Sequence, residues 1–231
     1  MDECENGADK LLAKIKIAFE KENFSECRSI YNEMEKRHPD SKLFNEVKKL
    51  YERAFSIEKK REEERIRQAE REKQEKLRAL KKLKKEYDDV SGITWYKQPY
   101  FTHYTNTYLT SIYLGHENNS VWLRLRMSYE GDDWIFFERA YLSYDSNTME
   151  IFFNEYNDKE TDSGYGGRIW EWIDVQVTPE LKVFLEGFAE SPNAKMRFSG
   201  KYTKTRKLTR NERKGISDVL KGYDALKEGL N

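Results

Sequence analysis

Alternating apolar and polar positions are clearest between residues 120 and 154. One face of an extended segment there carries apolar side chains, namely Val121, Leu123, Leu125, Met127 and Tyr129. The other face carries Trp122, Arg124, Arg126 and Ser128. This period of two predicts a β-strand with one buried face. Turn residues at 130–133 and 145–147 separate it from aromatic segments at 134–144 and 149–153, so we expect a three-stranded meander.

The same periodicity predicts further strands in the second half of the chain, at 92–96, 108–115, 169–177 and 196–202. Two amphipathic helices are expected near 179–191 and 209–229. Thr178 with Pro179 opens the first, and a capping box formed by Thr209 and Glu212 opens the second. Residues 88–231 are therefore predicted to form an antiparallel β-sandwich-like domain with two packed helices.

Helical periodicity dominates the first part of the chain. Segments 10–20 and 24–37 predict a helical hairpin, and a third helix is expected from Ser41 to Tyr87. Its middle, residues 58–76, is polar all round, so we expect a solvent-exposed spacer that could self-associate as a coiled coil. Residues 1–87 are predicted to form a helical hairpin plus a long charged helix, and the fold class is α+β.

Charge and cysteine content exclude several classes of protein. The net charge is zero over the chain, which argues against a general nucleic-acid binder. Two cysteines, Cys4 and Cys27, cannot form a disulfide framework or a zinc site. There is no apolar run long enough to span a membrane and no apolar leader. The sequence as it stands favours a cytoplasmic protein, or an envelope protein if Cys4 is the lipid-attachment site of a truncated lipoprotein.

Several sequence motifs occur in order along residues 88–228: Gly-Ile-Thr-Trp-Tyr from Gly92, the hairpin containing Asp-Asp-Trp-Ile-Phe-Phe from Asp132, and Trp-Glu-Trp from Trp170. Together they resemble a β-domain of uncharacterised bacterial proteins, many of them lipoproteins, and of some phage proteins. The resemblance implies a β-sandwich-like fold and no catalytic residue. The first hairpin, with Cys27, Tyr31 and Pro39, resembles a single tetratricopeptide-type repeat, although an ordinary helical hairpin fits equally well.

Reactive side chains form no recognisable motif. His38, His103 and His116 have no acidic or cysteine neighbour at a motif spacing, so we expect no catalytic role for them. The acidic segment from Asp158 resembles a calcium loop but has Ile169 where the bidentate acid belongs. We therefore expect no enzyme, no cofactor and no metal site.

One candidate binding face remains. The strand positions opposite the core bring together tryptophan, arginine and tyrosine side chains: Trp122, Arg124, Arg126, Arg139, Tyr141, Trp170 and Trp172. Trp, Tyr and Arg are enriched in protein-binding hot spots, and aromatic rings also stack on sugars. Alternatively, one of the two helices covers this face and makes it a second core. The sequence thus favours a non-enzymatic interaction or scaffold protein with a protein partner, and alternatively an envelope-attached module for carbohydrate or peptide.

Overall fold

The computed structural model describes the backbone of residues 2–230 and the side chains of residues 7–230. Close contacts divide the chain into two units, residues 1–71 and 72–231, which we describe separately. The sequence placed the boundary later, between residues 87 and 88. The side chain of Cys4, and with it the lipid-attachment prediction, lies outside the described residues.

The first unit is helical. It contains α1 (Asp2–Glu20), α2 (Phe24–Arg37) and the first part of α3 (Phe44–Lys82). The predicted apolar stripes meet in one small core, which includes Ile15, Cys27 and Met34, all fully buried. Stacking of Tyr31 on Tyr51, with ring centroids 4.3 Å apart, packs α3 against the hairpin. Of residues 58–76, for which the polar sequence predicted exposure, residues 59–75 are exposed, and Glu58 and Lys76 are half-buried.

The second unit contains two antiparallel sheets. The larger has six strands in the order β1-β2-β3-β4-β8-β7, and the smaller has four in the order β10-β9-β5-β6. The strands of the larger sheet are β1 (Lys84–Asp88), β2 (Ile93–Lys97), β3 (Thr110–Glu117), β4 (Ser120–Gly131), β7 (Lys159–Ser163) and β8 (Ile169–Gln176). Those of the smaller sheet are β5 (Arg139–Tyr144), β6 (Asn147–Ile151), β9 (Lys195–Ser199) and β10 (Thr203–Lys207).

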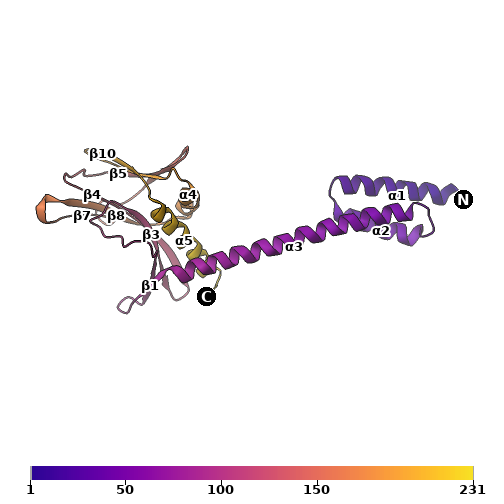
Figure 1. Ribbon diagram of the computed structural model, residues 1–231, viewed down its shortest axis with the longest axis horizontal. Helices are drawn as coiled ribbons and strands as arrows, with labels where there is room; N and C mark the ends of the chain where they lie inside the picture. The colour runs from indigo at the N-terminus through magenta and orange to yellow at the C-terminus, as the bar shows by residue number, and fades with distance from the viewer. Residues whose placement is uncertain (1, 231) are drawn as a thin grey trace. The chain divides into compact units, whose positions relative to one another are not determined.

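Helices α4 (Pro179–Glu190) and α5 (Arg210–Lys227) lie between the two sheets where these diverge (Figure 1). Their apolar residues join the inner faces of both sheets in a single hydrophobic core. Both helices begin as predicted: Thr178 caps α4, and the Thr209–Glu212 capping box opens α5. The predicted α+β class and the β-sandwich-like architecture are confirmed.

Two predictions about local structure are wrong. The third helix ends at Lys82, not at Tyr87, because residues 84–88 pair with β2 as the edge strand β1. The predicted meander is interrupted, because residues 132–138 are not a strand and carry the chain from the larger sheet to the smaller one. The acidic segment that begins at Asp158 forms β7, and a 3₁₀ turn, Tyr165–Gly167, follows it.

A buried carboxylate holds the segment that crosses between the sheets. Glu171 on β8 is fully buried and accepts hydrogen bonds from the backbone N–H groups of Ile135, Phe136 and Phe137, at 2.8, 3.0 and 3.2 Å. Phe136 adopts a left-handed backbone with φ of 44°. Successive N–H groups that point at one anion require such an irregular backbone, which excludes a regular strand here.

Candidate functional site

The candidate site is the outer face of the larger sheet, the face turned away from the core. On β4 the inward side chains are buried and the outward side chains of Trp122, Arg124 and Arg126 are half-buried. Because α4 and α5 pack into the core on the inner side, neither helix covers the outer face in the described part of the chain. The alternative in which a helix turns this face into a second core is therefore not what the described residues form.

The structure brings five of the seven predicted face residues together. Trp170 and Trp172 lie on β8, beside β4, and pair with Glu130 and Ser128. They thus share the outer face with the three β4 residues. Arg139 and Tyr141 lie on β5 of the smaller sheet. The sequence could not separate them, since it gives no sign that the chain changes sheets at residues 132–138.

Trp122 lies flat on the sheet. Its indole ring covers Gly115 on β3, where an added β-carbon would overlap the ring. Trp95 on β2 meets it edge-on, with centroids 5.8 Å apart and planes at 86°. Trp95 also contacts the ring of Tyr113 at 5.4 Å. The result is a connected aromatic surface to which Trp95 and Tyr113 also contribute, two residues outside the predicted face.

Two arginines share one carboxylate beside this surface. Arg124 Nε lies 2.7 Å from Asp174 Oδ1, and Arg126 Nη2 lies 2.7 Å from Asp174 Oδ2. The hydroxyl of Tyr113 donates to the same carboxylate at 2.7 Å, and burial together with the Asp174 charge raises the pKa of Tyr113 to about 12. Two positive charges against one negative charge leave a surplus. Alternation in the β8 sequence could have identified Asp174, because it shares a face with the two tryptophans.

A cavity of about 510 Å³ opens at one end of the outer face. The segment between β2 and β3 folds over the sheet there and closes one side. Its main walls are aromatic and polar side chains, among them Trp95, Phe101, His103, Ser111, Tyr113 and Arg126. A concave space of this size with aromatic walls and a few polar groups is typical of small-ligand sites.

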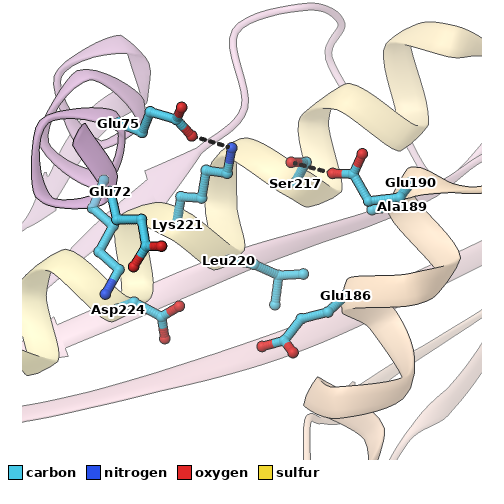
Figure 2. A pocket seen from close by; sticks show the side chains of 10 residues that line it. Glu72, Glu75, Glu186, Ala189, Glu190, Ser217, Leu220, Lys221 and Asp224 are labelled. Carbon is cyan, nitrogen blue, oxygen red and sulfur yellow. Dashed lines mark hydrogen bonds and ion pairs between the residues drawn. The ribbon is translucent and has the colours of Figure 1, made fainter. Parts of the chain in front are cut away.

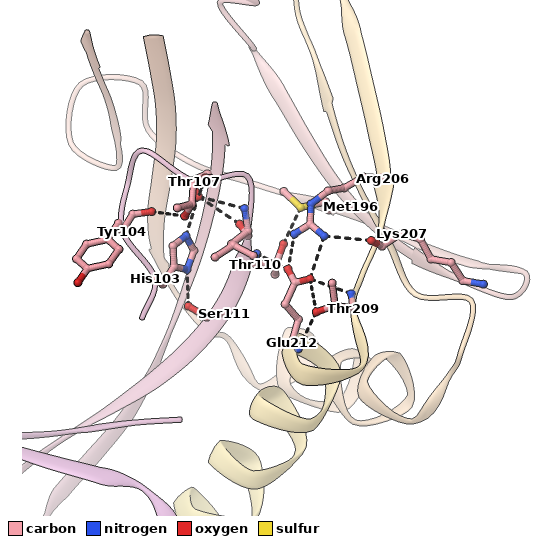
Figure 3. Close-up of polar contacts among 12 residues, drawn as sticks. His103, Tyr104, Thr107, Thr110, Ser111, Met196, Arg206, Lys207, Thr209 and Glu212 are labelled. Atoms are coloured by element: carbon pink, nitrogen blue, oxygen red, sulfur yellow. Dashed lines mark hydrogen bonds and ion pairs between the residues drawn. The ribbon is translucent and has the colours of Figure 1, made fainter. Parts of the chain in front are cut away.

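His103 bridges two serines at the back of this cavity (Figure 3). Its Nδ1 lies 2.6 Å from Ser111 Oγ, and its Nε2 lies 2.7 Å from Ser128 Oγ. The Ser128 hydroxyl donates to the carbonyl of Thr107, so its oxygen accepts the proton of Nε2–H. That assigns Nδ1 as the acceptor of the Ser111 hydroxyl.

Burial, with a smaller contribution from the nearby Arg126 charge, lowers the pKa of His103 to about 3. General-base catalysis by a serine–histidine pair needs an imidazole that can take a proton, usually with a carboxylate at the second nitrogen. Here Ser128 occupies that place and the protonated form is strongly disfavoured. The arrangement therefore makes His103 a neutral, fixed part of the cavity wall whose two ring nitrogens are already hydrogen-bonded.

A second polar network fixes β3 next to this wall (Figure 3). Glu212 of the α5 capping box is fully buried and accepts from the N–H of Thr110 at 2.9 Å and from Arg206 Nη1 at 2.9 Å. Burial opposes ionisation of Glu212, but the hydrogen bonds and charge of Arg206 keep its pKa below the ordinary value. Thr110 precedes Ser111, so this network sets the position of one cavity residue.

A separate hollow of about 290 Å³ lies among α3, α4 and α5 (Figure 2). Many of its lining residues are charged, but they pair with one another or with neighbours. Lys221 Nζ lies 3.1 Å from Glu75, and the Ser217 hydroxyl lies 3.4 Å from Glu190. We interpret this hollow as a junction where three helices pack.

Comparisons of the chain with protein-family models, with curated proteins and with solved structures give no match. The resemblance to the bacterial and phage β-domain therefore stays a prediction. Among the described residues, no His, Cys, Asp and Glu side chains gather into a group able to hold a metal ion. None of the described helices combines the length and the apolar character that a membrane span requires.

Proposed function

We propose that this is a non-enzymatic binding protein whose β-domain docks a protein partner on the outer face of the larger sheet. The observation that supports the proposal is the half-buried surface, covered by no helix of the described residues, that is formed by Trp95, Trp122, Arg124, Arg126 and the two β8 tryptophans. Tryptophan, tyrosine and arginine carry most of the energy in protein interfaces.

The arrangement of the arginines favours binding energetically. Arg124 and Arg126 are already held by Asp174, with about a third of each side chain exposed (30 and 31 %). A partner therefore loses little free energy in ordering them, whereas free arginine side chains cost about 0.5–1.5 kcal/mol each to immobilise. The flat position of Trp122 on Gly115 gives the same advantage.

The long helix supports the scaffold part of this proposal. Residues 61–70 of α3 are exposed and strongly charged, and i,i+3 ion pairs such as Arg65–Glu62 stabilise the helix without a partner. In our proposal α3 acts as a spacer between the helical hairpin and the β-domain. Self-association along α3 is a further part of the proposal, supported by the exposed Ile66 on this otherwise polar stretch.

A carbohydrate or peptide ligand is the second candidate function. The cavity beside His103 supports it, because flat protein-docking surfaces do not require a concave space of about 510 Å³. In this alternative the rings of Trp95 and Tyr113 stack against the ligand.

Site-specific photo-crosslinking in the source cells tests the protein-partner proposal. A photoreactive phenylalanine at Trp172 probes the outer face, and the same residue at Val183, which is 68 % exposed on α4, is the matched control. We expect a discrete cross-linked protein from position 172 that disappears when Arg124 and Arg126 are both replaced by glutamine. Identical adduct patterns from both positions would refute a specific partner on this face.

A further inference from the structure

The cavity beside His103 carries more positive than negative charge. Lys84, Lys97 and Arg126 line it, and Glu86 is the one carboxylate among its described lining residues. Glu86 pairs with Lys97 at 2.5 Å. Arg126 shares Asp174 with Arg124, and Lys84 makes no ion pair within the described residues. The unbalanced charge therefore belongs to Lys84 and to the arginine pair.

The other walls add shape and hydrogen bonding but no charge. Trp95 and Tyr113 offer ring faces, and the Arg126 guanidinium stacks over the Tyr113 ring at 5.4 Å. His103 is neutral, and both of its ring nitrogens are already hydrogen-bonded to Ser111 and Ser128, so this wall offers a ligand the acceptor oxygen of Ser111 rather than the imidazole. A ligand that suits these walls has a ring with an apolar face, a hydroxyl group that can donate to Ser111 Oγ, and one negative charge.

The floor of the cavity argues against an extended peptide. It consists of the outer faces of β1, β2, β3 and β4. The backbone groups of β2, β3 and β4 already pair on both sides, and the free edge of β1 lies in the plane of the sheet, beside the floor. An extended peptide binds best by adding its own backbone to a free strand edge. Recognition on this floor must therefore come from side chains and ring faces, which is how sugar rings are bound.

We infer that the cavity is a subsite for a uronic acid, the carboxylate-bearing sugar of an acidic oligosaccharide. Its ring stacks on Trp95, and its carboxylate pairs with Lys84, while Arg126, which lies three strands away on β4, can pair with the carboxylate of a neighbouring sugar. The inference rests on the second candidate function, a carbohydrate-binding module, and names the class of sugar. A carboxylate carries a single charge, which matches the one free lysine at this end of the cavity.

Calorimetric titration of the full chain with trigalacturonate, and with the neutral glucose trimer maltotriose, tests the inference. We expect trigalacturonate to bind, to weaken as salt rises from 50 to 300 mM, and to bind at least about tenfold tighter than maltotriose. Lys84→Gln should weaken the acidic trimer by about threefold to tenfold and leave the thermal transition unchanged, because Lys84 is exposed. The matched control is Lys85→Gln, since Lys85 is also exposed but lies over the Tyr96 ring on the opposite face of β1.

Each other outcome overturns the inference in a recognisable way. Equal binding of both trimers would show a sugar site without charge selection. Binding of triglutamate in place of trigalacturonate would assign the cavity to a peptide. Binding that Lys84→Gln leaves unchanged would place the site elsewhere. If neither trimer binds, a sugar is not the ligand of this cavity. None of these results affects cross-linking at Trp172, which tests the protein-partner proposal separately.

Discussion

His103 should make the stability of the β-domain sensitive to mild acid. In the folded protein its pKa is about 3, whereas an exposed histidine in the unfolded chain has a pKa of about 6.5. The folded pKa is the lower one, so between these values the unfolded chain takes up a proton that the folded chain refuses. The contribution of neutral His103 to the free energy of unfolding is therefore complete well above pH 6.5, and it falls as the pH drops toward 3.

The size of this effect follows from the two pKa values. At pH 5 the medium is about 1.5 pH units below the unfolded pKa, and each unit corresponds to about 1.36 kcal/mol. We therefore expect His103 alone to reduce the free energy of unfolding by about 2 kcal/mol between pH 7.5 and pH 5. The folded carboxylate of Glu212, whose pKa is lowered, loses its contribution only at more acidic pH.

Urea unfolding followed by tryptophan fluorescence measures this difference. All five tryptophans lie in the β-domain, at 95, 122, 134, 170 and 172, so the signal reports that unit alone. His103→Gln keeps an amide that can bond both serines but cannot titrate, and it should lose about 2 kcal/mol less than the parent protein over the same pH range. His116→Gln is the control, because it removes a histidine of β3 that lies outside the serine network. Equal pH dependence in the parent and in His103→Gln would refute the reasoning, since the imidazole would then take up a proton in the folded state.

Three further predictions concern the arm, the boundary between the units and the aromatic face. Amide hydrogens of residues 61–70 should exchange much faster than those of β4, and equal protection by mass-spectrometric exchange would show that the arm is packed. A fragment of residues 72–231 should unfold cooperatively on heating, because it keeps Leu80 and Leu83 in the β-domain core, whereas a fragment of residues 88–231 should be less stable. Trp122→Ala should cost about 1–3 kcal/mol in urea unfolding, less than the 3–5 kcal/mol of a fully buried aromatic, because half-burial leaves less contact to lose. A loss of about 3–5 kcal/mol in the free energy of unfolding would indicate that other residues cover the outer face.

The sequence predicted those features that depend on neighbours along the chain. Alternation on β4 identified both of its faces, and the capping box at Thr209 identified the start of α5. It could not predict the change of sheet at residues 132–138, because Glu171, which holds that segment, lies some 35 residues later along the chain. The hydrogen bonds of His103 could not be predicted for the same reason, since its partner Ser128 lies 25 residues away along the chain and no local spacing connects the two.

Glu171 also determines how the two sheets can come apart. Its carboxylate belongs to the larger sheet, while the three N–H groups that it binds lead directly into the smaller one. Lys159 Nζ lies 3.6 Å from the carboxylate and donates to the carbonyl of Phe137, so the same segment is held through both its N–H and its C=O groups. Separating the sheets would leave a charge in an apolar interior before water could reach it, which is costly. Residues 132–138 therefore keep the two sheets together until the whole sandwich opens, and we expect the two sheets to unfold in one cooperative transition.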